Sequence, residues 1–446
     1  MKMNEMPQSD EAVFELLHAP LAKEGEVARY SGEQLFSIEP AQLERVQLAI
    51  LQKRFSELAP RLPALQKLVD ENRIARIAAV DDVVPLLFPH TTYKSYPLSL
   101  IDNCRFEQLN AWLNDLTTND LSGLDVSRCE SLEEWLDVVE ANTSVRIQTS
   151  SGTSGKISLL PKDKREVDYS CSGFAAALST FGDEPGFADA FAPNIYLVYP
   201  FARHSRHSTG ILVKTFVEQG FHGDASHVLA LDGKMSTDLL WMSGRIKKAQ
   251  ADGTVEQLKK TKAWQRLSDK FAELDAGKTE SLEEFFKDVV IKLKDKTIVM
   301  IIGINYYLAM VECAGRHGLE MRFAPDSYLA LGGGQKWDTI SAAQKEKIWK
   351  ALPFQFNKYY GFSETLEAGP ARMCAAGNYH ASPWVMNFVL NPDTGAPYPR
   401  RGTQTGRFAV FDLWAHTYWG GFITGDEVTV SWDRACGCGR KGPYIH

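Results

Sequence analysis

The stretch Thr149–Ser158, which reads TSSGTSGKIS, constrains this chain more than any other segment. It places two glycines and five hydroxyl side chains directly before Lys156. Glycine lets backbone N–H groups approach an anion, and short hydroxyl side chains add donors without blocking the approach. Residues 144–148 read as a strand before this loop, and residues 165–178 read as a helix after it. A strand, a glycine-rich loop and a helix are typical of phosphate sites in α/β proteins.

The spacing of the loop disfavours a P-loop ATPase. Only Thr153 and Ser154 separate Gly152 from Gly155, whereas a Walker A loop needs four residues between its glycine and its Gly-Lys pair. An ordinary flexible loop stays open as the alternative, because it has the same composition. The residues expected to bind phosphate are Ser151, Gly152, Thr153, Ser154, Gly155 and Lys156.

Length and charge narrow the class of protein. A chain of 446 residues with 44% hydrophobic residues is long enough for two or three structural units with a substantial core. The net charge of −7 and the lack of a basic block disfavour nucleic acid as the main partner. The longest apolar run, Thr297–Val311, is too short to span a bilayer. Seven cysteines in an acidic chain predict reduced thiols, and with no apolar leader we expect a cytoplasmic protein.

Apolar runs of strand length follow the glycine loop. Residues 194–199, 297–303 and 328–331 alternate with helical patterns, which predicts a doubly wound parallel sheet with ligand at the strand ends. Three glycines end the last of these runs, namely Gly332, Gly333 and Gly334. They form either a simple tight turn or a stretch of backbone that a ligand can contact closely.

Two later motifs carry polar residues next to predicted strands. Tyr360–Glu364, which reads YGFSE, follows a strand predicted at 354–359. Its aromatic ring could stack on a base, and the Glu364 carboxylate could hold a Mg²⁺ ion. Phe422–Asp426, which reads FITGD, is predicted to end a strand in a turn. Asp426 could accept hydrogen bonds from both ribose hydroxyls there, and a turn without a ligand is the alternative.

These motifs together resemble those of the adenylate-forming superfamily, which contains the acyl-CoA synthetases and adenylation domains. Ser151–Lys156 resembles the phosphate-gripping signature, Tyr360–Glu364 the Tyr-Gly-x-Ser/Thr-Glu motif, and Thr424–Asp426 the Thr-Gly-Asp motif. Gly439-Arg440 falls where the hinge arginine of the family would be. Within the superfamily, Cys436–Arg440 most resembles the phenylacetate-coenzyme A ligase branch, and an acyl-protein synthetase branch is the other candidate.

The resemblance implies a fold and a division of the chain. The expected fold is α/β, a large N-terminal domain with doubly wound sheets and a small β-barrel-like subdomain. The mobile C-terminal lid of the family is expected to be absent, because the chain stops at His446. The expected parts are a helical region at 1–143, an α/β nucleotide- and acyl-binding core at 144–395, and a β-rich subdomain at 396–446 that ends at the hinge.

The resemblance also implies an activity. The enzyme would use ATP to convert a carboxylic acid into an acyl-adenylate with release of pyrophosphate, and then pass the acyl group to coenzyme A or to a protein thiol. Glu364 would hold Mg²⁺, Ser363 would donate to phosphate, and Arg440 would contact the ribose. His207, in a His-x-x-Gly element, would gate the acyl pocket, with His204 as the fallback.

Other readings of the activity stay open. One is an acyl-protein synthetase like that of bacterial luminescence systems, which passes the acyl group to a protein partner. The other is a lid-less nucleotide-binding scaffold. The expected partners are a carboxylic acid with coenzyme A or an acyl-carrying protein, and a homodimer is left open.

A last pattern predicts a structural zinc site. Three cysteines and a histidine make a set that borderline-soft Zn²⁺ favours, and a comparable grouping occurs in the phenylacetate-ligase branch. The predicted ligands are Cys374, His380, Cys436 and Cys438. Four unligated side chains, with Cys-Gly-Cys as a tight turn, are the alternative. Cys313 and His317 are weaker substitutes as ligands.

Overall fold

The computed structural model describes residues 8–18, 32–150, 156–179, 189–206, 208–233, 236–332, 341–344, 346, 355–366 and 371–446. The α-helices are α1 Asp10–His18, α2 Gly32–Leu35, α3 Pro40–Leu58, α4 Pro63–Asn72, α5 Leu98–Asp102, α6 Phe106–Asn114, α7 Leu132–Asn142, α8 Lys164–Ser179, α9 Ser208–Thr215, α10 Thr237–Asp252, α11 Val255–Leu258, α12 Lys262–Lys292 and α13 Ile304–Arg316. The strands are β1 Phe88–Pro89, β2 Val145–Thr149, β3 Leu159–Asp163, β4 Ile195–Ala202, β5 Val228–Leu231, β6 Thr297–Ile302, β7 Tyr328–Leu331, β8 Gln355–Tyr360, β9 Ala371–Met373, β10 Tyr379–Ala381, β11 Val385–Leu390, β12 Thr403–Asp412, β13 Gly421–Ser431 and β14 Tyr444–Ile445. The shorter helical turns are η2 Val80–Leu86, η3 Thr92–Lys94, η4 Phe216–Gly220 and η5 Ala225–His227.

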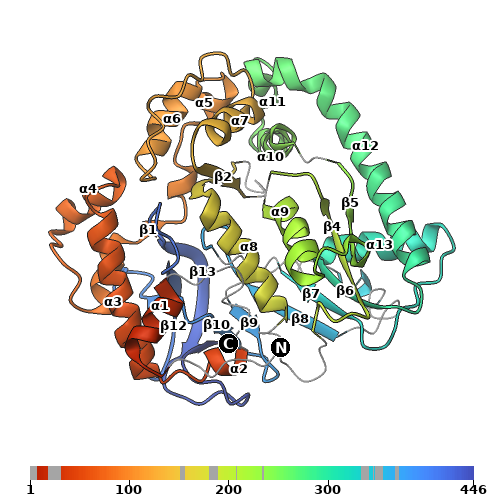
Figure 1. Cartoon of the computed structure of the whole chain (residues 1–446). Helices are drawn as coiled ribbons and strands as arrows, with labels where there is room; N and C mark the ends of the chain where they lie inside the picture. The colour runs from red at the N-terminus through yellow and green to blue at the C-terminus, as the bar shows by residue number, and fades with distance from the viewer. Residues whose placement is uncertain are drawn as a thin grey trace.

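One half of the main sheet is parallel (Figure 1). Its strands run in the order β5-β4-β6-β7-β8, and each pairs in parallel with its neighbour. The order reverses at β4, because β5 lies on one side of it and β6 on the other. Crevices that bind ligands in such sheets open at the carboxyl ends of the strands near this reversal. The predicted doubly wound sheet is confirmed, as is the α/β class.

Helices cover both faces of this parallel half, as the apolar run of β6 requires. Val299 and Ile301 of β6 pack in one core with residues of α8 and α9. Ile298 and Met300 point to the opposite face and pack with residues of α12 and α13 (Figure 1). Successive side chains of a strand point to opposite faces, so a strand buried on both sides reads as a continuous apolar run.

The other half of the sheet is antiparallel, except for the short β1, which pairs in parallel with β13, and it packs on the N-terminal helices. Strands β9 to β14 join the parallel half through the antiparallel pair β8–β9. The Arg54 side chain of α3 donates from Nε to the Leu413 carbonyl at 3.0 Å, and Gln47 donates to the Pro383 carbonyl at 2.7 Å. The expected boundary at residues 395–396 falls in the loop between β11 and β12, two paired strands of this sheet.

A second strand, β3, follows the glycine loop in the sequence, and the sequence prediction missed it. β2 pairs with β3 in a separate antiparallel sheet, from Val145 opposite Asp163 to Thr149 opposite Leu159. A strand therefore intervenes between the loop and α8. All five residues of β3 are buried, and a buried run this short gives no periodicity by which a strand can be recognised. In the described part of the chain, no helix has both the length and the apolar character needed to cross a bilayer.

Candidate functional site

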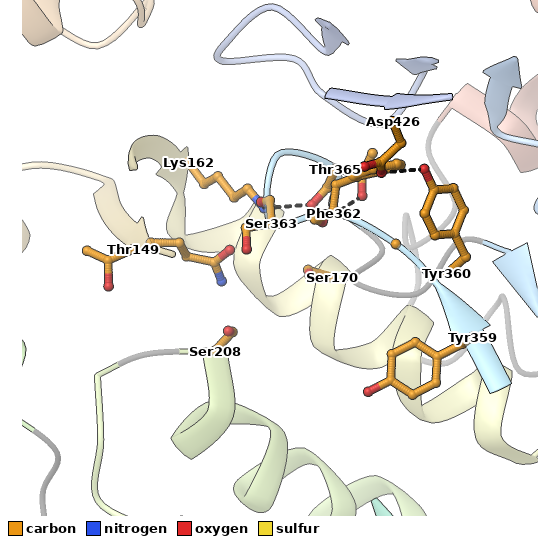
Figure 2. A pocket seen from close by; sticks show the side chains of 12 residues that line it. Thr149, Lys162, Ser170, Ser208, Tyr359, Tyr360, Phe362, Ser363, Thr365 and Asp426 are labelled. Carbon is orange, nitrogen blue, oxygen red and sulfur yellow. Dashed lines mark hydrogen bonds between the residues drawn. The ribbon is translucent and has the colours of Figure 1, made fainter. Parts of the chain in front are cut away.

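A cavity of about 270 Å³ opens beside the carboxyl end of β8 (Figure 2). Segments that lie far apart in the sequence meet in its wall, since β2, β3, α8, the start of α9, the end of β8 and β13 all contribute. The residues that line it are Gln148, Thr149, Lys162, Ser170, Ser208, Tyr359, Tyr360, Gly361, Phe362, Ser363, Thr365 and Asp426. The cavity thus lies at the strand ends where a doubly wound sheet binds its ligand.

Tyr360 and Asp426, from two of the predicted motifs, meet in this wall. The Tyr360 hydroxyl donates to Asp426 Oδ2 at 2.7 Å (Figure 2). Burial, followed by this hydrogen bond, raises the pKa of Tyr360 above its ordinary value, so the hydroxyl stays protonated and donates at neutral pH. The ring is held edge-on against Phe362 with centroids 4.9 Å apart. The arrangement presents an aromatic ring and an oriented carboxylate side by side.

Asp426 lies in a bulge of β13. The sequence analysis predicted that the strand would end there. β13 runs on to Ser431, but residues 424–426 lie opposite the single residue Phe408 of β12. The Thr424 hydroxyl donates to the Phe408 carbonyl at 2.8 Å and accepts from the Asp426 N–H at 3.1 Å. These bonds replace ladder bonds that the bulge removes, so the strand continues and the Asp426 side chain stays exposed.

Glu364 lies at the edge of this site, against Ser158. The Ser158 hydroxyl donates to Glu364 Oε1 at 3.3 Å, and the Ser158 N–H donates to the Ser150 hydroxyl at 2.8 Å. Ser150 precedes and Ser158 follows residues 151–155, which lie outside the described residues. Ser363 lines the cavity, whereas Glu364 is absent from the residues that line it. A carboxylate with neighbouring hydroxyls supplies the oxygen donors that Mg²⁺ prefers.

Lys162 is a cavity residue that sequence reasoning missed. Its Nζ donates to the Ser363 carbonyl at 2.8 Å and to the Thr365 carbonyl at 2.7 Å (Figure 2). Burial lowers the pKa of Lys162 to about 8, and the nearby carboxylates, of which Asp412 has the largest effect, counteract it. The ammonium therefore stays charged at pH 7. A lysine inside a buried strand was the signal in the sequence, once β3 is recognised.

Two predicted cofactor residues point elsewhere in this structure. Lys156 donates from Nζ to the Tyr96 carbonyl and lies 4.5 Å from the centre of the Tyr96 ring. The Arg440 guanidinium lies 4.8 Å from the centre of the Phe36 ring. Neither side chain is among those that line the cavity. Their predicted contacts with phosphate and ribose stay predictions.

Gly332 is described and lies where backbone must approach a ring. A Cβ at this position would fall 2.2 Å from Cζ of Tyr359, which lines the cavity. Phe201 packs against Tyr199 with ring centres 4.6 Å apart and against Tyr306 at 5.5 Å. Phe201 and Tyr199 belong to the same hydrophobic core as Tyr359. The rings of Phe201, Tyr199 and Tyr306 are not among those that line the cavity.

Several predicted site residues lie outside the described residues. They are Ser151, Gly152, Thr153, Ser154, Gly155, His207, Gly333 and Gly334. Of their neighbours, Ser208 lines the cavity and His204 is exposed.

The four predicted zinc ligands come together although up to 64 positions separate them in the sequence. Their ligand atoms all lie within 4.8 Å of one another. Cys374 Sγ lies 3.7 Å from Cys436 Sγ, and Cys438 Sγ lies 3.3 Å from His380 Nε2. Tetrahedral zinc, with Zn–S of about 2.3 Å and Zn–N of about 2.0 Å, separates two sulfurs by about 3.8 Å and a sulfur from a nitrogen by about 3.5 Å.

The protonation state of His380 also suits a metal. Burial, aided by the charge of Arg440, lowers the pKa of His380 to about 4, so the imidazole is neutral at pH 7. Neutral imidazole is the form that binds metal.

Cys313 and His317, the weaker substitutes, lie apart from the cluster, and His317 Nε2 is 2.6 Å from Glu283 Oε1. Arg316 also contacts Glu283, at 3.3 Å, so this second group reads as ion pairs between α12 and α13.

Comparison of the sequence with family models and with curated proteins gives no match. Among solved structures, the chain is similar to an open conformation of 2-hydroxyisobutyryl-CoA ligase in complex with 2-HIB-AMP and CoA. The TM-score is 0.51 at 10% identity, over 92% of this chain and 69% of that chain. A weaker match is ATP-bound MatB from Rhodopseudomonas palustris, with a TM-score of 0.35 and 14% identity over 67% of this chain and 46% of that chain. Another is the amide bond synthetase McbA from Marinactinospora thermotolerans, with a TM-score of 0.33 and 12% identity over 68% of this chain and 48% of that chain. At 10% identity the likeness to the ligase concerns the fold.

Proposed function

Since the chain has the fold of the adenylate-forming enzymes, we propose that it uses ATP to activate a carboxylic acid as an acyl-adenylate. The observation that carries the proposal is the hydrogen bond between Tyr360 and Asp426 in the wall of the cavity. It brings two motifs that are 66 residues apart to the strand ends where this fold class binds ligands. In the proposal, Tyr360 and Gly361 face the base, and Asp426 accepts from the ribose hydroxyls.

The chemistry needs orientation and charge neutralisation more than a general base. An oxygen of the acid attacks the α-phosphorus, the bond from that phosphorus to the pyrophosphate oxygen breaks, and pyrophosphate leaves. The carboxylate is already a nucleophile, so the protein gains rate by holding it in line with the leaving group. Hydroxyl and backbone donors of the glycine loop and of Ser363 neutralise charge that develops on the phosphate oxygens.

A Mg²⁺ ion bound with ATP fits the donors at the edge of the site. Glu364 and the hydroxyl of Ser158 offer hard oxygen ligands, 3.3 Å apart, beside the glycine loop. Magnesium keeps several waters and uses few protein carboxylates, so a single glutamate is sufficient. When bound, the ion would offset the negative charge of the phosphates.

We also propose an acyl acceptor and a class of acid. The 2-hydroxyisobutyryl-CoA ligase was solved with CoA, and we propose coenzyme A as the acceptor here, with a protein thiol as the alternative. Phe201 and Tyr199, which pack in one core with the cavity residue Tyr359, support an acid with an apolar body. His207, which precedes α9 in the sequence and lies outside the described residues, stays the proposed gate of the acyl pocket.

Pyrophosphate release tests the proposal. The purified chain is given MgATP and a panel of aryl and fatty acids, and released pyrophosphate is measured with and without acid. We expect release that depends on one class of acid. ATP binding without release for any acid would favour the scaffold. Coenzyme A is then added with the active acid, and an acyl-CoA thioester distinguishes the ligase from an acyl-protein synthetase.

We also propose that Cys374, His380, Cys436 and Cys438 hold a structural zinc ion. The sulfur and nitrogen separations agree with a tetrahedral site, and the ion would tie the β9–β10 hairpin to the segment before β14. Elemental analysis of protein purified without chelator is expected to find one zinc per chain. The double change Cys436→Ser and Cys438→Ser should remove it, and Cys313→Ser should not. Full zinc in the double variant would rule out this site.

A further inference from the structure

The cavity contains a buried lysine that the proposed chemistry does not use. Lys162 on β3 is 1% exposed. Its two hydrogen bonds go to the carbonyls of Ser363 and Thr365, the residues on either side of Glu364. Taking an ammonium out of water is costly, and hydrogen bonds to it offset that cost only where the geometry is good. The position of this charge under the Glu364 segment therefore calls for a specific role.

The rest of the Glu364 segment is held from other directions. The Tyr418 hydroxyl donates to the Glu364 carbonyl at 3.0 Å. The Leu366 N–H donates to Oδ2 of Asp412, a fully buried residue at the end of β12, at 2.5 Å. Three successive carbonyls, from 363 to 365, and the next N–H thus all have side-chain partners. Lys162 supplies two of these four bonds from the glycine-loop side of the site.

We propose that Lys162 is the positioning residue for Glu364. By fixing the carbonyls of the residues before and after Glu364, it orients the carboxylate toward Ser158. This inference rests on the proposed function, in which Glu364 binds the Mg²⁺ of MgATP. Lys162 acts through the backbone of this segment, because both of its hydrogen bonds go to backbone carbonyls.

Lys164 is a matched control. Its Nζ donates to the carbonyls of Glu140 and Thr143, at 2.7 and 2.8 Å. The side chain, the two-carbonyl bonding pattern and the region of the chain are the same, but Lys164 is half-buried and the anchored segment is the C-terminal end of α7. A general loss of stability from removing a lysine of this kind would appear in both variants.

Calorimetry on the full chain tests the inference. ATP affinity is measured with Mg²⁺ and with a chelator in its place, for Lys162→Met, Lys162→Arg and Lys164→Met, after thermal unfolding has shown that each folds. Lys162→Met is expected to reduce the Mg²⁺-dependent gain in ATP affinity by about tenfold, the scale of one charge-assisted hydrogen bond, and to leave the metal-free affinity unchanged. Lys162→Arg should keep part of the Mg²⁺-dependent gain in ATP affinity, and Lys164→Met should keep all of it. In a Glu364→Gln background, Lys162→Met should have no further effect.

Hydrogen exchange of the peptide that covers 363–366 gives a second readout that needs no nucleotide. Exchange should be faster in Lys162→Met and unchanged in Lys164→Met. If Lys162→Met does not fold, Lys162→Gln, which is polar and uncharged, is measured in its place with the same expected losses. A folded variant with wild-type Mg²⁺ dependence and wild-type exchange would overturn the inference, as would an equal loss in Lys164→Met. If the wild type itself shows no Mg²⁺-dependent ATP binding, the proposed function fails, and exchange alone decides the role of Lys162.

Discussion

Removing the hydroxyl of Tyr360 tests how the cavity would recognise a nucleotide. Tyr360→Phe deletes the one atom that donates to Asp426 Oδ2, at 2.7 Å, and keeps the ring. Asp426 is exposed, so without this bond its carboxylate samples more orientations and meets the ribose hydroxyls less often. A hydrogen bond to a charged group contributes about 1.5–3 kcal/mol. Because the site is solvated, we expect the lower end of this range, which corresponds to about tenfold weaker ATP binding.

Calorimetry with two nucleotides isolates the contribution of the ribose. ATP binding to Tyr360→Phe should weaken about tenfold, whereas binding of 2′,3′-dideoxy-ATP should change little, because it lacks the hydroxyls that Asp426 would bind. Asp426→Ala should show the same selectivity. Tyr379→Phe is the control, since that ring belongs to the same aromatic group, with its centre 6.4 Å from that of Tyr360.

Two results would refute this reasoning. An equal loss for both nucleotides would mean that Tyr360 contributes through its ring and not through the orientation of Asp426. Unchanged ATP affinity in both Tyr360→Phe and Asp426→Ala would show that the pair does not contact the ribose. Either outcome would require another assignment for Asp426.

Three further changes test other parts of the molecule. Glu364→Gln should abolish Mg²⁺-dependent pyrophosphate release with the fold intact, and wild-type release from a folded variant would contradict this. Gly210→Ala should lower the unfolding free energy by about 1–3 kcal/mol in urea titrations, because the new Cβ would fall 2.2 Å from the Ser205 carbonyl oxygen and backbone must move; an unchanged midpoint would disprove it. Burial, with a smaller effect from Arg54, lowers the pKa of His18 to about 4 from 6.5. The unfolded chain then binds a proton that the folded chain does not, so stability should fall as pH falls from 6.5 toward 4, and His18→Gln should reduce this slope. Unfolding free energies are measured in urea titrations at pH 7 and pH 5. An equal difference between the two pH values in the wild type and in His18→Gln would contradict that origin.

The sequence predicts those parts of the site whose residues belong to short, local motifs. Tyr360, Gly361 and Asp426 lie in one cavity wall, and the Cys₃His cluster assembles, because each motif fixes its own local geometry and the doubly wound fold brings the strand ends together. Lys162 was not predictable in this way. Its partner carbonyls lie 201 and 203 positions away, and a backbone carbonyl has no signature in the sequence.

The missed strand has a similar cause. β3 is short, and β-pairing is a non-local property that propensity predicts poorly. The turn into α8 did carry a readable signal, because Asp163 and Glu166 form a capping arrangement in which the Asp163 N–H donates to Glu166 Oε2 at 2.7 Å. The other oxygen of Glu166 accepts the His416 N–H at 2.8 Å and the Thr417 N–H at 2.9 Å, contacts that only the folded chain reveals.

Oxygen transfer from the acid to AMP tests the central claim most directly. The active acid, labelled with ¹⁸O in its carboxylate, is incubated with the enzyme, MgATP and coenzyme A, and the products are analysed by mass spectrometry. Attack of the carboxylate on the α-phosphorus, followed by thiol attack on the acyl carbon, leaves one acid oxygen on AMP, so the account predicts singly labelled AMP and unlabelled pyrophosphate. Label in inorganic phosphate, or thioester formation with unlabelled AMP, would contradict it.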